Sequence, residues 1–97
     1  MTREDVLERG KPISLELRSL GLGKLYLFGS VARNEPDTND VDFLFEAESD
    51  DALDFFKLVD ATERLETLLG QPVDLVNRKL LHRRIRPRVE SELIEIY

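Results

Sequence analysis

Two aspartates, Asp40 and Asp42, flank Val41 at the start of an apolar stretch that reads NDVDFLF over residues 39–45. The stretch is typical of a β-strand, in which residues two apart lie on the same face, roughly 7 Å apart along the backbone. Both carboxylates are therefore expected on one face, while Val41 and Phe43 pack on the other. A charge in a partly apolar strand costs free energy unless an opposite charge lies beside it. A bound metal ion is the expected opposite charge.

A third aspartate, Asp74, lies in a similar setting, between Val73 and Leu75 in the apolar segment PVDLV. If this segment is a strand next to the strand at 41–46, three carboxylates converge on one side of the sheet. Oxygen ligands of this kind suit Mg²⁺ or Mn²⁺. The alternative for Asp74 alone is a solvated charge at a strand edge.

Gly29 and Ser30 follow the apolar run LYLF over residues 25–28 and add a second feature. A glycine at the end of a buried strand lets a ligand approach the backbone closely. Backbone N–H groups of the following turn, with the Ser30 hydroxyl, can then hold phosphate oxygens. Each short pattern alone is weak, because a Gly-Ser pair is common and a D-x-D is usually a solvated loop. Their joint order indicates phosphoryl or nucleotidyl transfer, and the absence of GxxxxGKS/T excludes a P-loop.

Arg33 follows Ser30 by three residues, on the same side of a short helical turn. It either contacts phosphate, or pairs with Glu35 or an aspartate and holds the loop in place. We include Arg33 with Gly29 and Ser30 in the predicted nucleotide-binding set.

The chain resembles the minimal nucleotidyltransferases of the DNA polymerase β-like superfamily. The likeness rests on LFGSVARNEPDTNDVDFLF, which matches the family's GS-x-A-R and D-x-D pattern, on PVDLV, and on the ending RRIRPRVESELIEIY. Asn34 and Asn39 stand where the family commonly has Gly and Ser. Asparagine tolerates left-handed and turn conformations, so neither departure breaks the pattern.

The resemblance implies roles for the residues that match the motifs. Asp40, Asp42 and Asp74 are expected to be catalytic and to bind two Mg²⁺ ions. The turn at Gly29 and Ser30 is expected to hold a nucleoside triphosphate, with ATP as the substrate. Asp74 is implied either as general base or as a ligand of the ion nearest the attacking hydroxyl.

The family's small members resemble antitoxins that act on HEPN-domain ribonuclease toxins, and this implies a HEPN toxin as partner. The implied reaction is transfer of AMP from ATP to a tyrosine of that toxin. Two alternatives stay open: a non-catalytic antitoxin that masks its partner sterically, and a transferase whose acceptor is a small molecule.

Apolar periodicity and capping signals predict an α/β (α+β) fold, and the resemblance implies a polymerase β-like core. We expect a small mixed β-sheet of three to four strands with helices packed on one side. The predicted strands cover residues 25–28, 41–46, 72–76 and, at an edge, 94–97. The predicted helical segments cover residues 12–20, 30–33, 50–69 and 77–93. In the long helix, capped by Ser49 and Asp50, the expected buried stripe is Phe55, Val59, Thr62, Leu65 and Leu69.

At 97 residues with 41% hydrophobic side chains, the chain is expected to form a single domain over residues 1–97. It has no cysteine, and no leader or membrane span is recognisable, so we expect a cytoplasmic protein without a membrane partner. The net charge of −6 argues against general nucleic-acid binding. The sequence leaves open whether the protein forms a homo-oligomer.

The charge is unevenly placed, with −9 over residues 1–77 and +3 over residues 78–97. An anionic ligand or partner would therefore be drawn to the second segment. Its arginines are nevertheless interpreted as a solvated face rather than a binding site; they are Arg83, Arg84, Arg86 and Arg88.

Overall fold

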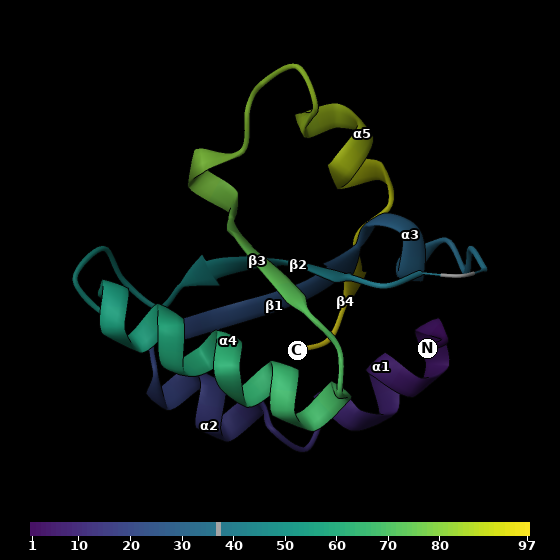
Figure 1. Ribbon diagram of the computed structural model, residues 1–97. Coiled ribbons are helices and arrows are strands. Elements are labelled where there is room, and N and C mark those ends of the chain that lie inside the picture. Colours follow the sequence, from purple (N-terminus) through teal and green to yellow (C-terminus); the bar gives the residue numbers. More distant parts are fainter. Residues whose placement is uncertain (37) are drawn as a thin grey trace.

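A four-stranded sheet in the order β3-β2-β1-β4 forms the centre of the computed structural model, which describes residues 1–36 and 38–97 (Figure 1). The strands are β1 (Leu22–Phe28), β2 (Val41–Ala47), β3 (Val73–Asn77) and β4 (Ile94–Glu95). β1 pairs antiparallel with both β2 and β4, whereas β2 pairs parallel with β3. The sheet is therefore mixed, with β3 and the short β4 at its edges.

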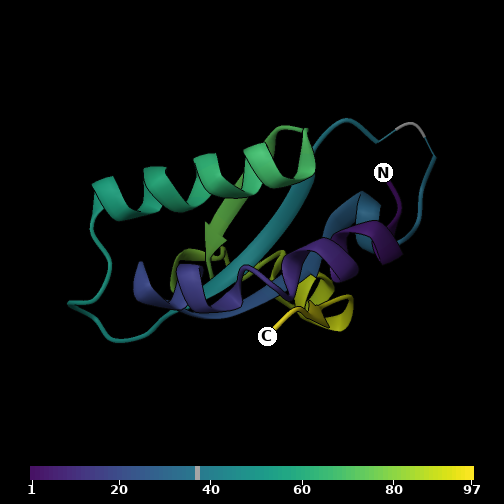
Figure 2. The ribbon, with the colours of Figure 1, turned by 90° about the horizontal axis from the view of Figure 1, so that it is seen from below.

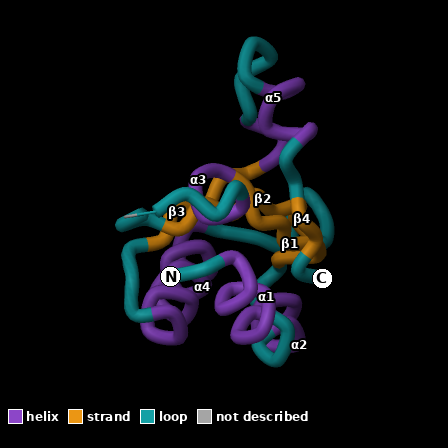
Figure 3. Tube along the Cα trace, turned by 90° about the vertical axis from the view of Figure 1, so that its right-hand side faces the viewer, coloured by secondary structure: helices purple, strands orange, loops and turns teal. Residues whose placement is uncertain are grey.

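Helices cover both faces of this sheet unequally (Figures 1 and 3). The larger layer is formed by α1 (Arg3–Gly10), α2 (Ser14–Ser19) and α4 (Phe55–Leu69). Figure 2, seen from below, shows α4 lying beside the α1–α2 pair on the same face of the sheet. The 3₁₀ turn η1 (Arg78–Leu80) and α5 (Arg86–Ser91) rise over the opposite face, and α3 (Gly29–Ala32) is a single turn directly after β1. The predicted mixed sheet with helices is confirmed. The expectation that the helices pack on one side was wrong for η1 and α5, which lie over the second face.

Alternation along β2 separates two apolar clusters. Phe43 and Phe45 are fully buried between the sheet and the α1–α2–α4 layer. Leu44 points to the other face, where it packs with Val89 of α5 in a smaller cluster. Each fully buried side chain of this size contributes about 1.5–3 kcal/mol relative to exposure. The same alternation places Asp42 on the face of the smaller cluster.

Helix α4 begins later than the sequence predicted. Its N-cap is Asp54, whose Oδ1 accepts a hydrogen bond from the backbone N–H of Lys57 at 2.8 Å. Ser49 instead begins a separate turn, in which its carbonyl accepts a hydrogen bond from the N–H of Ala52. The predicted start at Ser49 and Asp50 was therefore wrong, because the effective capping carboxylate comes later in a run of acidic residues.

The buried side of α4 also differs from the predicted stripe. Ala61, Leu65 and Leu69 are buried, whereas Phe55 is 72% exposed and Val59 is 38% exposed. The buried residues recur at every fourth position, which places them on one face of the helix toward the sheet. Within the part of the chain that the structure describes, no helix is long and apolar enough to cross a membrane.

Replacing Asp54 with alanine removes the side-chain acceptor that caps α4, and we expect the free energy of unfolding to fall by about 1 kcal/mol. Ser49→Ala, at the cap position suggested by sequence alone, should change it by less than about 0.5 kcal/mol. Urea denaturation of the wild type and both variants measures these differences. A larger loss for Ser49→Ala than for Asp54→Ala would contradict the observed helix start.

Candidate active site

The carboxylates of Asp42 and Asp74 lie on adjacent strands, because β2 and β3 pair in parallel and these two residues are partners in the register. The predicted adjacency of the two strands is thereby confirmed. Asp40 lies one residue before β2 begins. Asp42 is half-buried, whereas Asp40 and Asp74 are exposed. The fold thus brings the three predicted aspartates to the same end of the β2–β3 pair.

The surroundings of Asp42 disfavour its charged form. Burial raises the pKa of this carboxyl above its ordinary value, and the charges of Asp74 and Asp40 raise it further. The Arg33 guanidinium lowers the pKa, with a smaller effect. Three mutually repelling carboxylates in a partly apolar setting are an oxygen donor set of the kind that Mg²⁺ or Mn²⁺ prefers.

The aspartates do not by themselves form a finished metal site. Within residues 1–36 and 38–97, no three histidine, aspartate or glutamate side chains are placed so that one ion could be held by them all. The backbone register of Asp42 and Asp74 fits such a site, and Asp40 and Asp74 are exposed. The chemistry of the donor set therefore suits a divalent cation, and the side-chain positions need adjustment to bind it.

The turn at Gly29 lies directly against Asp42. Gly29 is buried and has a φ of 80°, in the left-handed region that favours glycine. A Cβ at this position would collide with the Oδ2 atom of Asp42. Asn34, just after α3, also adopts a left-handed φ of 57°, as expected of an asparagine there. The predicted phosphate turn and the predicted metal ligands are thus neighbours, and the absence of a side chain at Gly29 makes this contact sterically possible.

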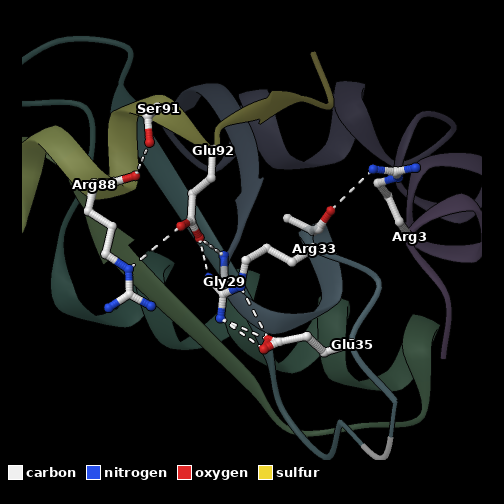
Figure 4. A network of polar contacts seen from close by, with 8 residues as sticks. Arg3, Gly29, Arg33, Glu35, Arg88, Ser91 and Glu92 are labelled. Atoms are coloured by element: carbon white, nitrogen blue, oxygen red, sulfur yellow. Dashed lines mark hydrogen bonds and ion pairs between the residues drawn. The ribbon is translucent and has the colours of Figure 1, made fainter.

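Glu92 is a site residue that the sequence analysis missed. Its Oε2 accepts a hydrogen bond from the backbone N–H of Gly29 at 2.7 Å and from Nη1 of Arg33 at 2.8 Å (Figure 4). Arg33 also pairs with Glu35 at 3.1 Å, which is the loop-holding alternative expected for it. Glu92 lies 63 positions beyond Gly29 in an ordinary mix of charged residues, so no local sequence signal indicates its role.

A cleft of about 360 Å³ runs between the Gly29 turn and α5. Its lining includes Gly29, Ser30, Arg33, Asp42 and, from the C-terminal segment, Arg88 with Glu92. A larger groove of about 540 Å³ lies between α2 and α4. None of the three predicted aspartates lines that groove, and ion pairs join Arg64 there to Glu16 and Asp60. The smaller cleft, which Asp42 lines, is therefore the candidate site.

Comparison with known proteins places this chain in an enzyme family. Residues 11–96 match the family model for the nucleotidyltransferase domain, and the chain therefore belongs to that family. It is a nucleotidyltransferase, as the resemblance noted in the sequence implied. A Methanocaldococcus jannaschii protein, provisionally named as a protein adenylyltransferase, is 33% identical over 72 residues, which cover 72% of this chain and 72% of the relative.

Solved structures agree with this assignment. One that is provisionally described as a minimal nucleotidyltransferase matches with a TM-score of 0.79 and 31% identity, over 97% of this chain and 95% of that chain. A chain in the structure of tri-AMPylated Shewanella oneidensis HEPN toxin in complex with MNT antitoxin matches with a TM-score of 0.65, over 94% of this chain and 71% of that one. At 21% identity, this second likeness shows the fold alone.

In metal-free buffer at pH 7, we expect Asp42→Asn to melt at or above the wild type. The folded-state pKa of Asp42 is raised, so the folded protein binds the proton more tightly than the unfolded chain does. The resulting loss of stability is absent below the ordinary carboxyl pKa of about 4 and grows as pH rises through the raised pKa. The difference in melting temperature between Asp42→Asn and the wild type should therefore be small near pH 4 and largest at neutral pH.

Thermal melts in EDTA between about pH 4 and pH 8 measure this difference. Asp51→Asn, in the exposed turn before α4, is the matched control for loss of one aspartate charge. If Asp42→Asn melts well below the wild type and Asp51→Asn at pH 7, Asp42 stabilises the fold and the repulsion argument is wrong.

Gly29→Ala should destabilise the protein more than Gly70→Ala. Both glycines have a positive φ, which costs alanine about 1–2 kcal/mol. A Cβ at Gly70 would meet nothing within 4 Å, whereas at Gly29 it would collide with the Asp42 carboxylate, adding about 1–3 kcal/mol. Urea denaturation measures both losses. The double variant Gly29→Ala/Asp42→Ala should recover much of the collision cost, and equal losses for the two single variants would contradict the close approach.

Proposed function

We propose that this chain is a Mg²⁺-dependent protein adenylyltransferase that transfers AMP from ATP to a tyrosine hydroxyl of a HEPN toxin. The observation that carries the proposal is the direct contact between the Gly29 turn and Asp42, with Asp74 in register on the next strand. Membership of the nucleotidyltransferase family supports the reaction class. The names of the M. jannaschii relative and of the toxin–antitoxin structure support a protein acceptor.

In this proposal the Gly29 turn and the three aspartates bind different parts of the substrate. The N–H groups of the Gly29 turn and the Ser30 hydroxyl donate to phosphate oxygens, and Arg33 supplies positive charge beside them. Asp40, Asp42 and Asp74 would hold two Mg²⁺ ions. When bound, these ions neutralise charge on the triphosphate and lower the pKa of the attacking hydroxyl.

The transfer itself forms a bond between the tyrosine oxygen and the α-phosphorus and breaks the bond from that phosphorus to the bridging oxygen of the leaving pyrophosphate. We assign the tyrosine proton to Asp74, because it is exposed on the edge strand β3 and lines the groove between that strand and α4. The acceptor is therefore expected to approach from the β3 edge. Asp42, which is half-buried beside the Gly29 turn, remains on the triphosphate side.

The surface next to Asp74 is suited to a protein acceptor. A groove of about 390 Å³ lies between α4 and β3, and Asp74, Leu58 and Val73 contribute to its lining. Phe55 and Phe56, at the start of α4, are 72% and 81% exposed. Large exposed apolar side chains on the helix that forms one wall of the groove are typical of a protein-binding surface. The proposed toxin would dock here and bring its tyrosine to the cleft.

Incubation with ATP labelled at the α-phosphate, Mg²⁺ and the protein encoded beside this chain tests the proposal. We expect label on that protein, and we expect Asp42→Asn or Asp74→Asn to reduce its rate by at least about a hundredfold, as for loss of a residue that supports transition-state charge. Asp51→Asn, on an exposed turn, should retain the wild-type rate. Phosphoamino-acid analysis of the labelled product identifies the acceptor residue.

The other outcomes separate the alternatives. A stable complex without label indicates a partner that is masked sterically, and label on a small molecule indicates a different acceptor. Transfer at the wild-type rate by Asp42→Asn would show that the metal and nucleotide site has been assigned to the wrong residues.

A further inference from the structure

Glu92 places a carboxylate at the backbone N–H that the proposed function reserves for phosphate. Its side chain is 16% exposed, and three donors surround it: Gly29 N at 2.7 Å, Arg33 Nη1 at 2.8 Å and, more loosely, Arg88 Nε at 3.9 Å. Figure 4 shows these groups pointing toward the Glu92 carboxylate from the turn and from α5. An amide N–H with two guanidinium groups is a set of donors that a phosphate oxygen would also use.

The position of Glu92 is electrostatically costly on one side and favourable on the other. Its charge adds to those that raise the pKa of Asp42, so it disfavours the charged form of that carboxylate. Its hydrogen bonds to Arg33 and the Gly29 N–H compensate for this repulsion. A nucleotide phosphate carries more negative charge than a carboxylate and can form the same contacts. It can also bind cations that the aspartates hold.

We propose that Glu92 is a built-in competitor for the phosphate position of the Gly29 turn, and that Arg33 and Arg88 pass from Glu92 to the nucleotide phosphates when the ligand binds. This inference rests on the proposed nucleotide site and adds Arg88 to it. Glu92 thus acts as an internal stand-in anion that keeps the turn and the two arginines in place in the free protein.

The attachment of Glu92 to the fold is compatible with such an exchange. Glu92 directly follows the six-residue helix α5, and the smaller apolar cluster holds this helix through Val89. Arg88 is 74% exposed and its contact with Glu92 is long, so it can turn to another anion at little cost. This competition lowers the apparent affinity for the nucleotide. If the contact between Glu92 and the Gly29 N–H is formed about ten times more often than it is open, nucleotide binding is about tenfold weaker.

The test compares Glu92→Gln with Glu90→Gln by calorimetric titration with Mg²⁺–ATP. Glutamine keeps the shape of Glu92 and can still accept from the Gly29 N–H, but it removes the competing charge. Glu90 lies in α5, two residues before Glu92, and pairs with Arg78 and Arg86, so Glu90→Gln removes an equal charge outside the contact. We expect Glu92→Gln to bind Mg²⁺–ATP about tenfold more tightly than the wild type, and Glu90→Gln to bind within about twofold of it.

The amide resonance of Gly29 gives a second readout that does not depend on turnover. In ¹H–¹⁵N spectra it should differ between the free wild type and Glu92→Gln, and the two should converge when ATP is bound. Arg88→Gln should weaken ATP binding several-fold, whereas an arginine on a merely solvated face would leave it unchanged. If Glu92→Gln does not fold, Arg88→Gln still tests whether Arg88 passes to the nucleotide phosphates.

Unchanged or weaker binding by a folded Glu92→Gln, while the wild type binds Mg²⁺–ATP, overturns the competitor role and leaves the proposed function standing. Unchanged binding by Arg88→Gln overturns the assignment of Arg88. If neither the wild type nor Glu92→Gln binds Mg²⁺–ATP, the proposed function and this inference both fail.

Discussion

The half-buried carboxylate of Asp42 beside a turn without a side chain is the constraint on which the site depends. Asp42 lies between Val41 and Phe43, which are fully buried on the opposite face of β2, so the pleat allows its side chain only one direction. Gly29 lets the backbone approach this carboxylate, because a Cβ would overlap with it. The Gly29 turn and the Asp42 carboxylate can therefore lie in direct contact, because no side chain at position 29 separates them.

The rest of the fold holds that pair in place. β2 lies between β1 and β3, so hydrogen bonds on both sides fix its backbone, and Phe28 of β1 is the register partner of Asp42 just before the Gly29 turn. The α1–α2–α4 layer packs against the other face of the same strand. β3 lies at the sheet edge, and this leaves Asp74 exposed. The same sheet therefore gives one carboxylate a protected position and another an accessible one.

Charge balance in the free protein links stability to the proposed function. The repulsion around Asp42 is a cost that a bound cation would remove, as is usual where a site is arranged for a ligand rather than for maximal stability. A ligand that binds only the folded protein stabilises it by mass action, so nucleotide and metal would offset the cost. Arg33 reduces the cost before any ligand arrives, because it lowers the pKa of Asp42, whereas the charge of Glu92 raises that pKa. Glu92 instead pairs with the Arg33 guanidinium at 2.8 Å and holds it beside the site.

The sequence by itself determined the local chemistry of this protein. The strand-like setting of Asp42 and Asp74, the Gly-Ser turn and the mixed sheet could all be predicted, because each depends on periodicity and residue type within a short segment. The start of α4 could not be predicted reliably, since a run of acidic residues offers several caps and only Asp54 makes the hydrogen bond.

The tertiary structure alone decided which distant groups meet. It brings Glu92 to the N–H of Gly29 and aligns Asp42 with Asp74 in a single register. Nothing in the residues around Glu92 distinguishes it from its acidic neighbour Glu90, which pairs with arginines elsewhere. The difference arises because the path of α5 over the sheet sets where each side chain points, and that path depends on packing across the whole chain rather than on any local pattern.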